Sequence, residues 1–290
     1  MIEPRWWRQE PQQEDGRERF YICGLCPRRC RLASGQTGFC RARGMDQNGF
    51  ISPYLGRFCS IAVDPIEKKP INCWRPGTAI LSLGSLGCTM NCLFCQNHTI
   101  AQPQTPVPLR ELSPDKLLET ALAESLPSVA YTYNEPALQG EYILHAAPKL
   151  REAGVATVLV TNGQFTGEAI SELSPWVDAA NVDVKTFNPA TYARLGGSLA
   201  AVQNTVSTML GNEVHVELTT LVVPGISDDQ DEFSELVDWI ASLSPAIPFH
   251  ISRYFPAHKY SAPPTSLELL RRFEGLAKAR LKRVFLGNVR

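Results

Sequence analysis

Short apolar segments alternate with helical segments from residue 78 to the end of the chain. The first, TAILSLGS (Thr78 to Ser85), is a compact apolar run, which is typical of a buried strand. Further strands are expected at SVAYTY, VATVLVT, AANVDVK, EVHVELTTLVV, IPFHIS and RVFLG. Because continuous apolar strands joined by helices form parallel sheets that are covered by those helices, we expect an α/β fold. The units fall short of a complete eightfold barrel, so the pattern predicts a partial, open parallel (β/α) barrel.

The helices between these strands have recognisable ends. Ser113 is a suitable N-cap for PDKLLETALAES, with Pro114 at the first helical position. Gly154 is expected to close the helix GEYILHAAPKLREA. Acidic residues begin DDQDEFSELVDWIASL, where negative charge stabilises a helix N-terminus.

The first part of the chain differs from the rest. It is rich in Arg, Gly, Pro and Cys and has little helical periodicity. We therefore expect two regions, an irregular cysteine-rich N-terminal region at residues 1–76 and the partial barrel at residues 77–290.

Charge and cysteine content restrict the partners and the compartment. The 28 Lys and Arg nearly balance the 29 Asp and Glu, which disfavours binding to nucleic acid or acidic membranes. No apolar run approaches the length of a membrane span. The polar residues 1–20 resemble neither a signal peptide nor a transit peptide. We expect a cytoplasmic protein whose nine cysteines are metal ligands, catalytic thiols or buried residues rather than disulfides.

Polar side chains follow several of the expected strands. The strongest candidates are Glu135, Asn162, Asp183, Lys185 and His250. Each alone has an ordinary structural explanation, and a single buried histidine is most often a core residue. Because the carboxyl ends of parallel strands meet at one mouth of a barrel, we expect these groups to converge on one site.

Three cysteines, Cys88, Cys92 and Cys95 (the loop cysteines), follow the first expected strand in GCTMNCLFCQN. They could be small buried apolar residues, or zinc ligands with His98 as the fourth. We favour an iron–sulfur cube. Such a cube normally takes four thiolates, so three would leave one iron open to a small molecule.

The pattern Cx3CxΦC, with the aromatic position at Phe94, resembles that of the radical S-adenosylmethionine (SAM) superfamily when it follows the first strand of a partial barrel. The resemblance implies a [4Fe–4S] cluster on the loop cysteines, with SAM on the open iron. It implies that the reduced cluster cleaves SAM to a 5′-deoxyadenosyl radical, which abstracts hydrogen from a substrate. An electron donor such as flavodoxin or ferredoxin would reduce the cluster, while the protein would position SAM and exclude water.

The same resemblance gives roles to the residues at the strand ends. Glu135 corresponds to the position that holds the SAM amine, and Asn162 to the position near the SAM ribose. Asp183 and Lys185 correspond to positions near the SAM carboxylate. His250 corresponds to a histidine that lines the site from a late strand.

The resemblance extends over nearly the whole chain, from Tyr21 to Val289. The motifs TYNEPA, VTNGQF, NVDVKTF, LTTLVVPGISDD, PFHISRYFP and FLGNV occur in the order of the pyruvate formate-lyase-activating-enzyme-like branch. Val160 stands where activating enzymes often have Asp, so their monovalent cation site is not expected. CGLCPRRCRLASGQTGFCRARG and DPIEKKP are similar to the radical SAM proteins of the AmmeMemoRadiSam system.

The resemblance implies an enzyme but does not name its substrate, which could be a protein or a small molecule. A glycyl-radical activase that acts on a partner protein is one alternative. A non-enzymatic iron–sulfur protein, working in electron transfer or as a scaffold, is another; it would require four-thiolate ligation and no SAM binding.

A second group of four cysteines lies in the N-terminal region: Cys23, Cys26, Cys30 and Cys40 (the N-terminal cysteines). Four thiolates can close a structural site, so zinc, a second iron–sulfur cluster and unliganded thiols are all open. Arg residues surround them, and we expect these to lower the thiol pKa values. The Arg residues are Arg28, Arg29, Arg31, Arg41 and Arg43. Cys59 and Cys73 are assigned to packing.

Overall fold

An eight-stranded sheet forms the centre of the structure, a computed structural model that describes residues 2–10 and 19–289. Its strand order is β15-β14-β13-β12-β11-β10-β8-β7. All neighbouring strands are parallel except β7, which pairs antiparallel with β8. The strands are β7 (Ser60–Pro65), β8 (Ala79–Gly84), β10 (Ser128–Tyr131), β11 (Ala156–Thr161), β12 (Ala179–Asp183), β13 (His215–Val222), β14 (Phe249–Arg253) and β15 (Val284–Gly287). The end strands β15 and β7 do not pair with each other within the described residues, so the prediction of an open, largely parallel sheet is confirmed.

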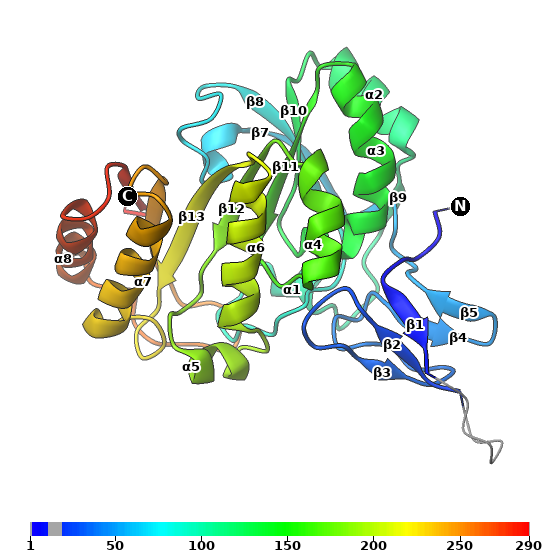
Figure 1. Ribbon diagram of the computed structural model, residues 1–290, viewed down its shortest axis with the longest axis horizontal. Coiled ribbons are helices and arrows are strands. Elements are labelled where there is room, and N and C mark those ends of the chain that lie inside the picture. The colour runs from blue at the N-terminus through cyan, green and yellow to red at the C-terminus, as the bar shows by residue number, and fades with distance from the viewer. Residues whose placement is uncertain (1, 11–18, 290) are drawn as a thin grey trace.

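Helices line one side of this curved sheet (Figure 1). The helices of the described residues are α1 (His98–Ala101), α2 (Pro114–Ala123), α3 (Gly140–Glu152), α4 (Gly167–Leu173), α5 (Pro189–Arg194), α6 (Leu199–Gly211), α7 (Gln230–Leu243) and α8 (Leu267–Lys278), of which α1 and α5 lie among the loops at one end of the strands. Three 3-10 turns accompany them: η1 (Ile66–Lys68), η2 (Pro136–Gln139) and η3 (Ser174–Trp176). Two helix ends follow the predicted signals, because the Ser113 side chain accepts the Lys116 N–H and Gly154 follows α3 with φ +76°.

The N-terminal region forms several short antiparallel pairs. Strands β1 (Trp7–Gln9), β2 (Tyr21–Cys23) and β3 (Arg31–Leu32) make one small sheet, and β4 (Gly44–Asp46) pairs with β5 (Gly49–Ile51). A third pair joins β6 (Arg57–Phe58) to β9 (Arg110–Glu111). Figure 1 shows β1 to β5 together at one end of the molecule, next to α4. The expected boundary at residues 76 and 77 stays a prediction, and the central sheet begins with β7 at residue 60.

A buried ion pair ties this region to the barrel. Arg43 is 1% exposed and Glu141 is fully buried, and Nη1 of Arg43 lies 2.6 Å from Oε1 of Glu141. The same carboxylate accepts the backbone N–H of Arg5 at 2.8 Å. Trp6 is buried beside this pair and donates from its ring N–H to Glu172 on α4. The N-terminal region is thus part of the same hydrophobic core as the barrel helices.

Replacing Glu141 with Ala should destabilise the protein, because the Arg43 guanidinium would be left buried without its counter-charge. Removing one partner of a buried pair costs about 3–5 kcal/mol. We expect the melting temperature to fall by roughly 5 to 15 °C. Glu152→Ala, at an exposed position of the same helix, is the control. Equal melting temperatures for the two variants would contradict a structural role for the pair.

Candidate active site

One cavity at the carboxyl ends of the parallel strands brings together most of the predicted site. It has about 1300 Å³ of empty space, part of it open to solvent. Six predicted site residues line it: Cys88, Cys92, Cys95, Asn162, Asp183 and Lys185. Glu135 and His250 are also buried near strands of the same sheet, but their hydrogen bonds are made within the protein.

The loop from β8 to α1 carries the loop cysteines and is held at two points. Gly87 has φ +90°, and a Cβ built on it would lie 2.4 Å from the Cys40 carbonyl oxygen, so no side chain fits there. Asn134 donates to the Gly87 carbonyl at 2.9 Å and accepts the Ser85 N–H at 3.0 Å. These contacts fix where the loop leaves the sheet.

The loop cysteines are partly buried free thiols. Burial raises the pKa of Cys92 to about 11, although the Lys185 cation lowers it. Burial raises the pKa of Cys88 as well, and its sulfur accepts from the Met90 N–H at 3.4 Å and the Asn162 side-chain amide at 3.5 Å. A bound metal would supply the positive charge that buried thiolates need.

The donor set fits an iron–sulfur cube with one open iron better than a zinc ion. Four thiolates on one zinc lie roughly 3.8 Å apart, which follows from a Zn–S distance of about 2.3 Å. Within residues 2–10 and 19–289, no group of three or more His, Cys, Asp or Glu could hold a single metal ion. His98, the alternative fourth ligand, instead places Nδ1 3.2 Å from the Cys95 carbonyl oxygen and stacks on His258.

Asp183 and Lys185 form a close pair on the cavity wall. Lys185 Nζ lies 2.6 Å from Asp183 Oδ2. Burial lowers the pKa of Lys185, but Asp183 and Cys92 outweigh it and raise the pKa above its usual value. Lys185 is therefore a fixed cation between a carboxylate and the loop cysteines, and can receive an anionic group.

Glu135 lies beneath the wall of the cavity and holds the end of strand β11. It is fully buried. Its oxygens accept the Thr161 hydroxyl at 2.7 Å, the Asn162 N–H at 2.9 Å and the Ala137 N–H at 3.0 Å. Burial raises the pKa of Glu135 to about 7 in spite of these donors. The contacts show Glu135 positioning Asn162, and its predicted contact with the SAM amine stays a prediction.

His250 belongs to a buried network deeper in the barrel. Its Nε2 lies 2.6 Å from Oε2 of Glu217, and Nε2 of His215 lies 3.0 Å from the other oxygen. Glu217 also accepts the N–H groups of Asn72 and Cys73. The network thus holds the segment between η1 and β8, and a role for His250 in cofactor binding stays a prediction.

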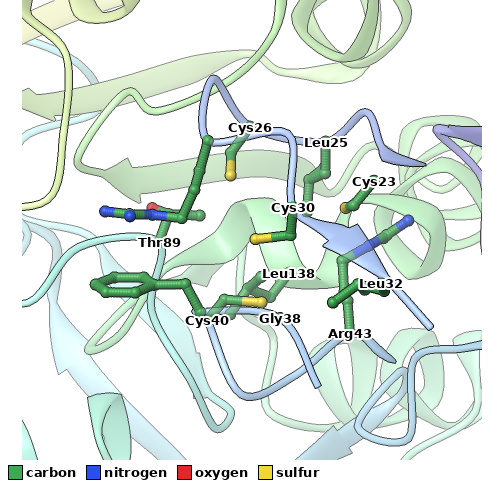
Figure 2. Close-up of a pocket in the computed structure, with 12 residues that line it drawn as sticks. Cys23, Leu25, Cys26, Cys30, Leu32, Gly38, Cys40, Arg43, Thr89 and Leu138 are labelled. Carbon is green, nitrogen blue, oxygen red and sulfur yellow. The ribbon is translucent and has the colours of Figure 1, made fainter. Parts of the chain in front are cut away.

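The N-terminal cysteines line a second cavity beside the first, with Cys23, Cys26 and Cys40 buried (Figure 2). The expectation that the neighbouring Arg residues lower the thiol pKa values is wrong for two of them. Burial raises the pKa of Cys26 to about 12 and that of Cys40 above its usual range. Arg43 does lower the pKa of Cys40, but the effect of burial outweighs it.

The residues Asp64, Lys69 and Tyr133 form a hydrogen-bonded group at the cavity wall that was not predicted from the sequence. Lys69 Nζ lies 2.7 Å from Asp64, and the Tyr133 hydroxyl donates to the same carboxylate at 2.6 Å. Burial alone would raise the pKa of Asp64, but these donors lower it. Lys69 and Tyr133 both line the cavity. The motifs DPIEKKP and TYNEP contain all three residues, yet nothing in the sequence indicates that they meet.

Comparison with known proteins identifies the class. The model of the radical SAM superfamily matches residues 83–240, more than half of the chain. An uncharacterized protein of Methanocaldococcus jannaschii is 36% identical over 272 residues, which cover 92% of this chain and 81% of that protein. The pyruvate formate-lyase-activating enzyme of Staphylococcus aureus is 27% identical over 63% of this chain and 78% of its own length.

The fold agrees with this match. A radical SAM methyltransferase from Sphaerobacter thermophilus superposes with a TM-score of 0.56 at 15% identity, covering 97% of this chain and 76% of that one. The chain therefore belongs to the radical SAM superfamily, whose members are enzymes that use an iron–sulfur cluster and SAM. The predicted family and the predicted fold class are both confirmed.

Every helix in the described part of the chain is too short or too polar to cross a membrane. The polar segment 1–20, expected to be neither a signal peptide nor a transit peptide, includes residues 1 and 11–18, which lie outside the described residues.

The Glu217 network predicts a pH-dependent contribution to stability. Burial would raise the pKa of Glu217, but His215, His250 and two backbone N–H groups lower it to about 2. Because this pKa is depressed on folding, the stabilisation is complete above the unfolded pKa of about 4.3 and is lost as the pH falls towards 2.

We expect Glu217→Gln to reduce the free energy of unfolding by on the order of 2–3 kcal/mol at pH 6. The difference between variant and wild type should shrink as the pH is lowered from 5 to 3. Thermal melts of the wild type and the variant over this pH range measure the difference. Glu235→Gln, at an exposed position, should show no such trend. A difference that stays constant with pH would contradict an ionised Glu217 in the folded protein.

Proposed function

We propose that this chain holds a [4Fe–4S] cluster on the loop cysteines and reductively cleaves SAM in the adjoining cavity. The observation that carries the proposal is the lining of that cavity, which combines three thiols with the Asp183–Lys185 pair and Asn162. When bound, the cluster would supply the electron that cleaves the sulfonium C–S bond of SAM, so that hydrogen is abstracted from a substrate and 5′-deoxyadenosine is formed.

The residues of the cavity wall have separate tasks in this proposal. Lys185 is a partly buried cation on the cavity wall and would bind the SAM carboxylate through a charge-assisted hydrogen bond. Asp183 keeps Lys185 charged and oriented through their 2.6 Å contact. Asn162, whose side chain donates to the Cys88 sulfur and whose backbone Glu135 holds, would contact the SAM ribose.

We further propose a one-electron donor such as flavodoxin or ferredoxin as the partner that reduces the cluster, and a cytoplasmic location. All nine cysteines are free thiols, which is typical of a reducing compartment. The electron-transfer or scaffold alternative has less support, because the superfamily is enzymatic and three cysteines, not four, line the cavity.

Replacing Cys92 with Ala should abolish SAM cleavage, because a cube with two thiolates is no longer held against an open iron. The measurement is 5′-deoxyadenosine formed per chain by anaerobically reconstituted protein with SAM and dithionite. Cys73→Ala, in the segment between η1 and β8 and outside both cysteine groups, should cleave SAM at the wild-type rate. SAM cleavage by Cys92→Ala at the wild-type level would contradict the proposal.

A second candidate is a glycyl-radical activase, in which the substrate is the backbone of a partner protein. The similarity to the Staphylococcus aureus activating enzyme over 63% of this chain favours it. The activase predicts a glycyl-radical signal in electron paramagnetic resonance (EPR) spectra of a co-purified partner incubated with this protein, SAM and reductant. 5′-Deoxyadenosine formation with no protein radical on any co-purified partner would favour a small-molecule or other protein substrate instead.

A further inference from the structure

The N-terminal cysteines line one small pocket, which is separate from the cavity that the loop cysteines line. Figure 2 shows their four sulfur atoms gathered about one space, with Leu25, Leu32 and Leu138 around them. The backbone holds them there, because the Cys23 N–H donates to the Cys30 carbonyl at 2.9 Å. None of the four is in a disulfide, although they lie close together.

The placement of these cysteines favours a cluster over a single ion. A tetrahedral zinc site draws four sulfurs to roughly 3.8 Å of one another and leaves no space between them, given Zn–S distances of about 2.3 Å. Among the residues that the structure describes, no such compact ligand group occurs. The loop cysteines, which the family match places on a cluster, also form no such compact group, so the two cysteine groups are alike in this respect.

The wall of the cavity suits a negatively charged group that accepts hydrogen bonds. Arg28 and Arg43 line it, and both are cations. The Nε of Arg43 is buried and has no hydrogen-bond partner among the described residues, while its Nη1 is used by Glu141. Sulfur atoms of iron–sulfur clusters accept such hydrogen bonds, and an unpaired buried N–H is otherwise costly.

The second cavity lies directly against the loop that carries the first cysteine group. Thr89 lines it and is the neighbour of Cys88 in the chain. The Cys40 carbonyl oxygen would be 2.4 Å from a Cβ on Gly87, the residue before Cys88. Only one layer of backbone and side chains therefore separates the two cysteine groups.

We propose that Cys23, Cys26, Cys30 and Cys40 bind a second [4Fe–4S] cluster, closed by four thiolates and adjacent to the first. Because each iron of this second cluster has a cysteine ligand, none is open and the cluster does not bind SAM. Because the two clusters are close, their spins interact when both are reduced.

The test is metal content and spectroscopy of the full chain, purified and reconstituted anaerobically. We expect about eight iron atoms per chain, four for each cube, and no zinc. Cys88→Ala/Cys92→Ala/Cys95→Ala should keep about four iron atoms in a cluster whose EPR signal is unchanged by SAM. Cys26→Ala/Cys40→Ala should also keep about four, with a SAM-responsive signal that lacks the broadening caused by a second spin.

Two results would overturn the second cluster: a folded triple variant that binds no iron, or a folded triple variant that binds one zinc in place of about four iron atoms. Cys73→Ala, which should keep the wild-type iron content, controls for the loss of a thiol elsewhere. If Cys26→Ala/Cys40→Ala does not fold, the iron contents of the wild type and of the triple loop-cysteine variant still test the second cluster. Failure of the proposed function would give a different result, because the EPR signal of the cluster on the loop cysteines would then not change when SAM is added.

Discussion

The close contact between Gly87 and the carbonyl of Cys40 determines how the two halves of the chain meet. It presses the N-terminal region against the loop that carries Cys88, and no side chain larger than hydrogen fits at that point. The buried Arg43–Glu141 pair also ties the N-terminal region to the barrel. The position of one cysteine group therefore depends on that of the other, and a change at the junction disturbs both.

Much of the barrel could be predicted because its signals are local. The apolar runs at β8 and β11, the Ser113 cap and Gly154 all lie where the sequence places them. The N-terminal region was harder, since its strands are two or three residues long and give no periodicity. Strand β7 was also missed, because its pairing with β8 depends on tertiary contacts rather than on a local pattern.

The candidate site could be predicted as far as strand topology brings residues together. The loop cysteines, Asn162 and the Asp183–Lys185 pair meet because parallel strands end at one edge. The partners of Glu135 and His250 could not be predicted, since Glu217 lies on another strand and the Asn162 backbone offers no signal in the sequence. The thiol pKa values could not be predicted from the nearby Arg residues, because burial raises them and the sequence does not show how deeply each thiol is buried.

The central claim is that the cube on the loop cysteines has an iron open to SAM. An anaerobic crystal structure of the reconstituted protein with SAM tests it most directly. The account predicts a cube bound by Cys88, Cys92 and Cys95, with the amino and carboxylate groups of SAM on the fourth iron and the carboxylate near Lys185. A fourth protein ligand on that iron, or SAM bound away from the cluster, would contradict it.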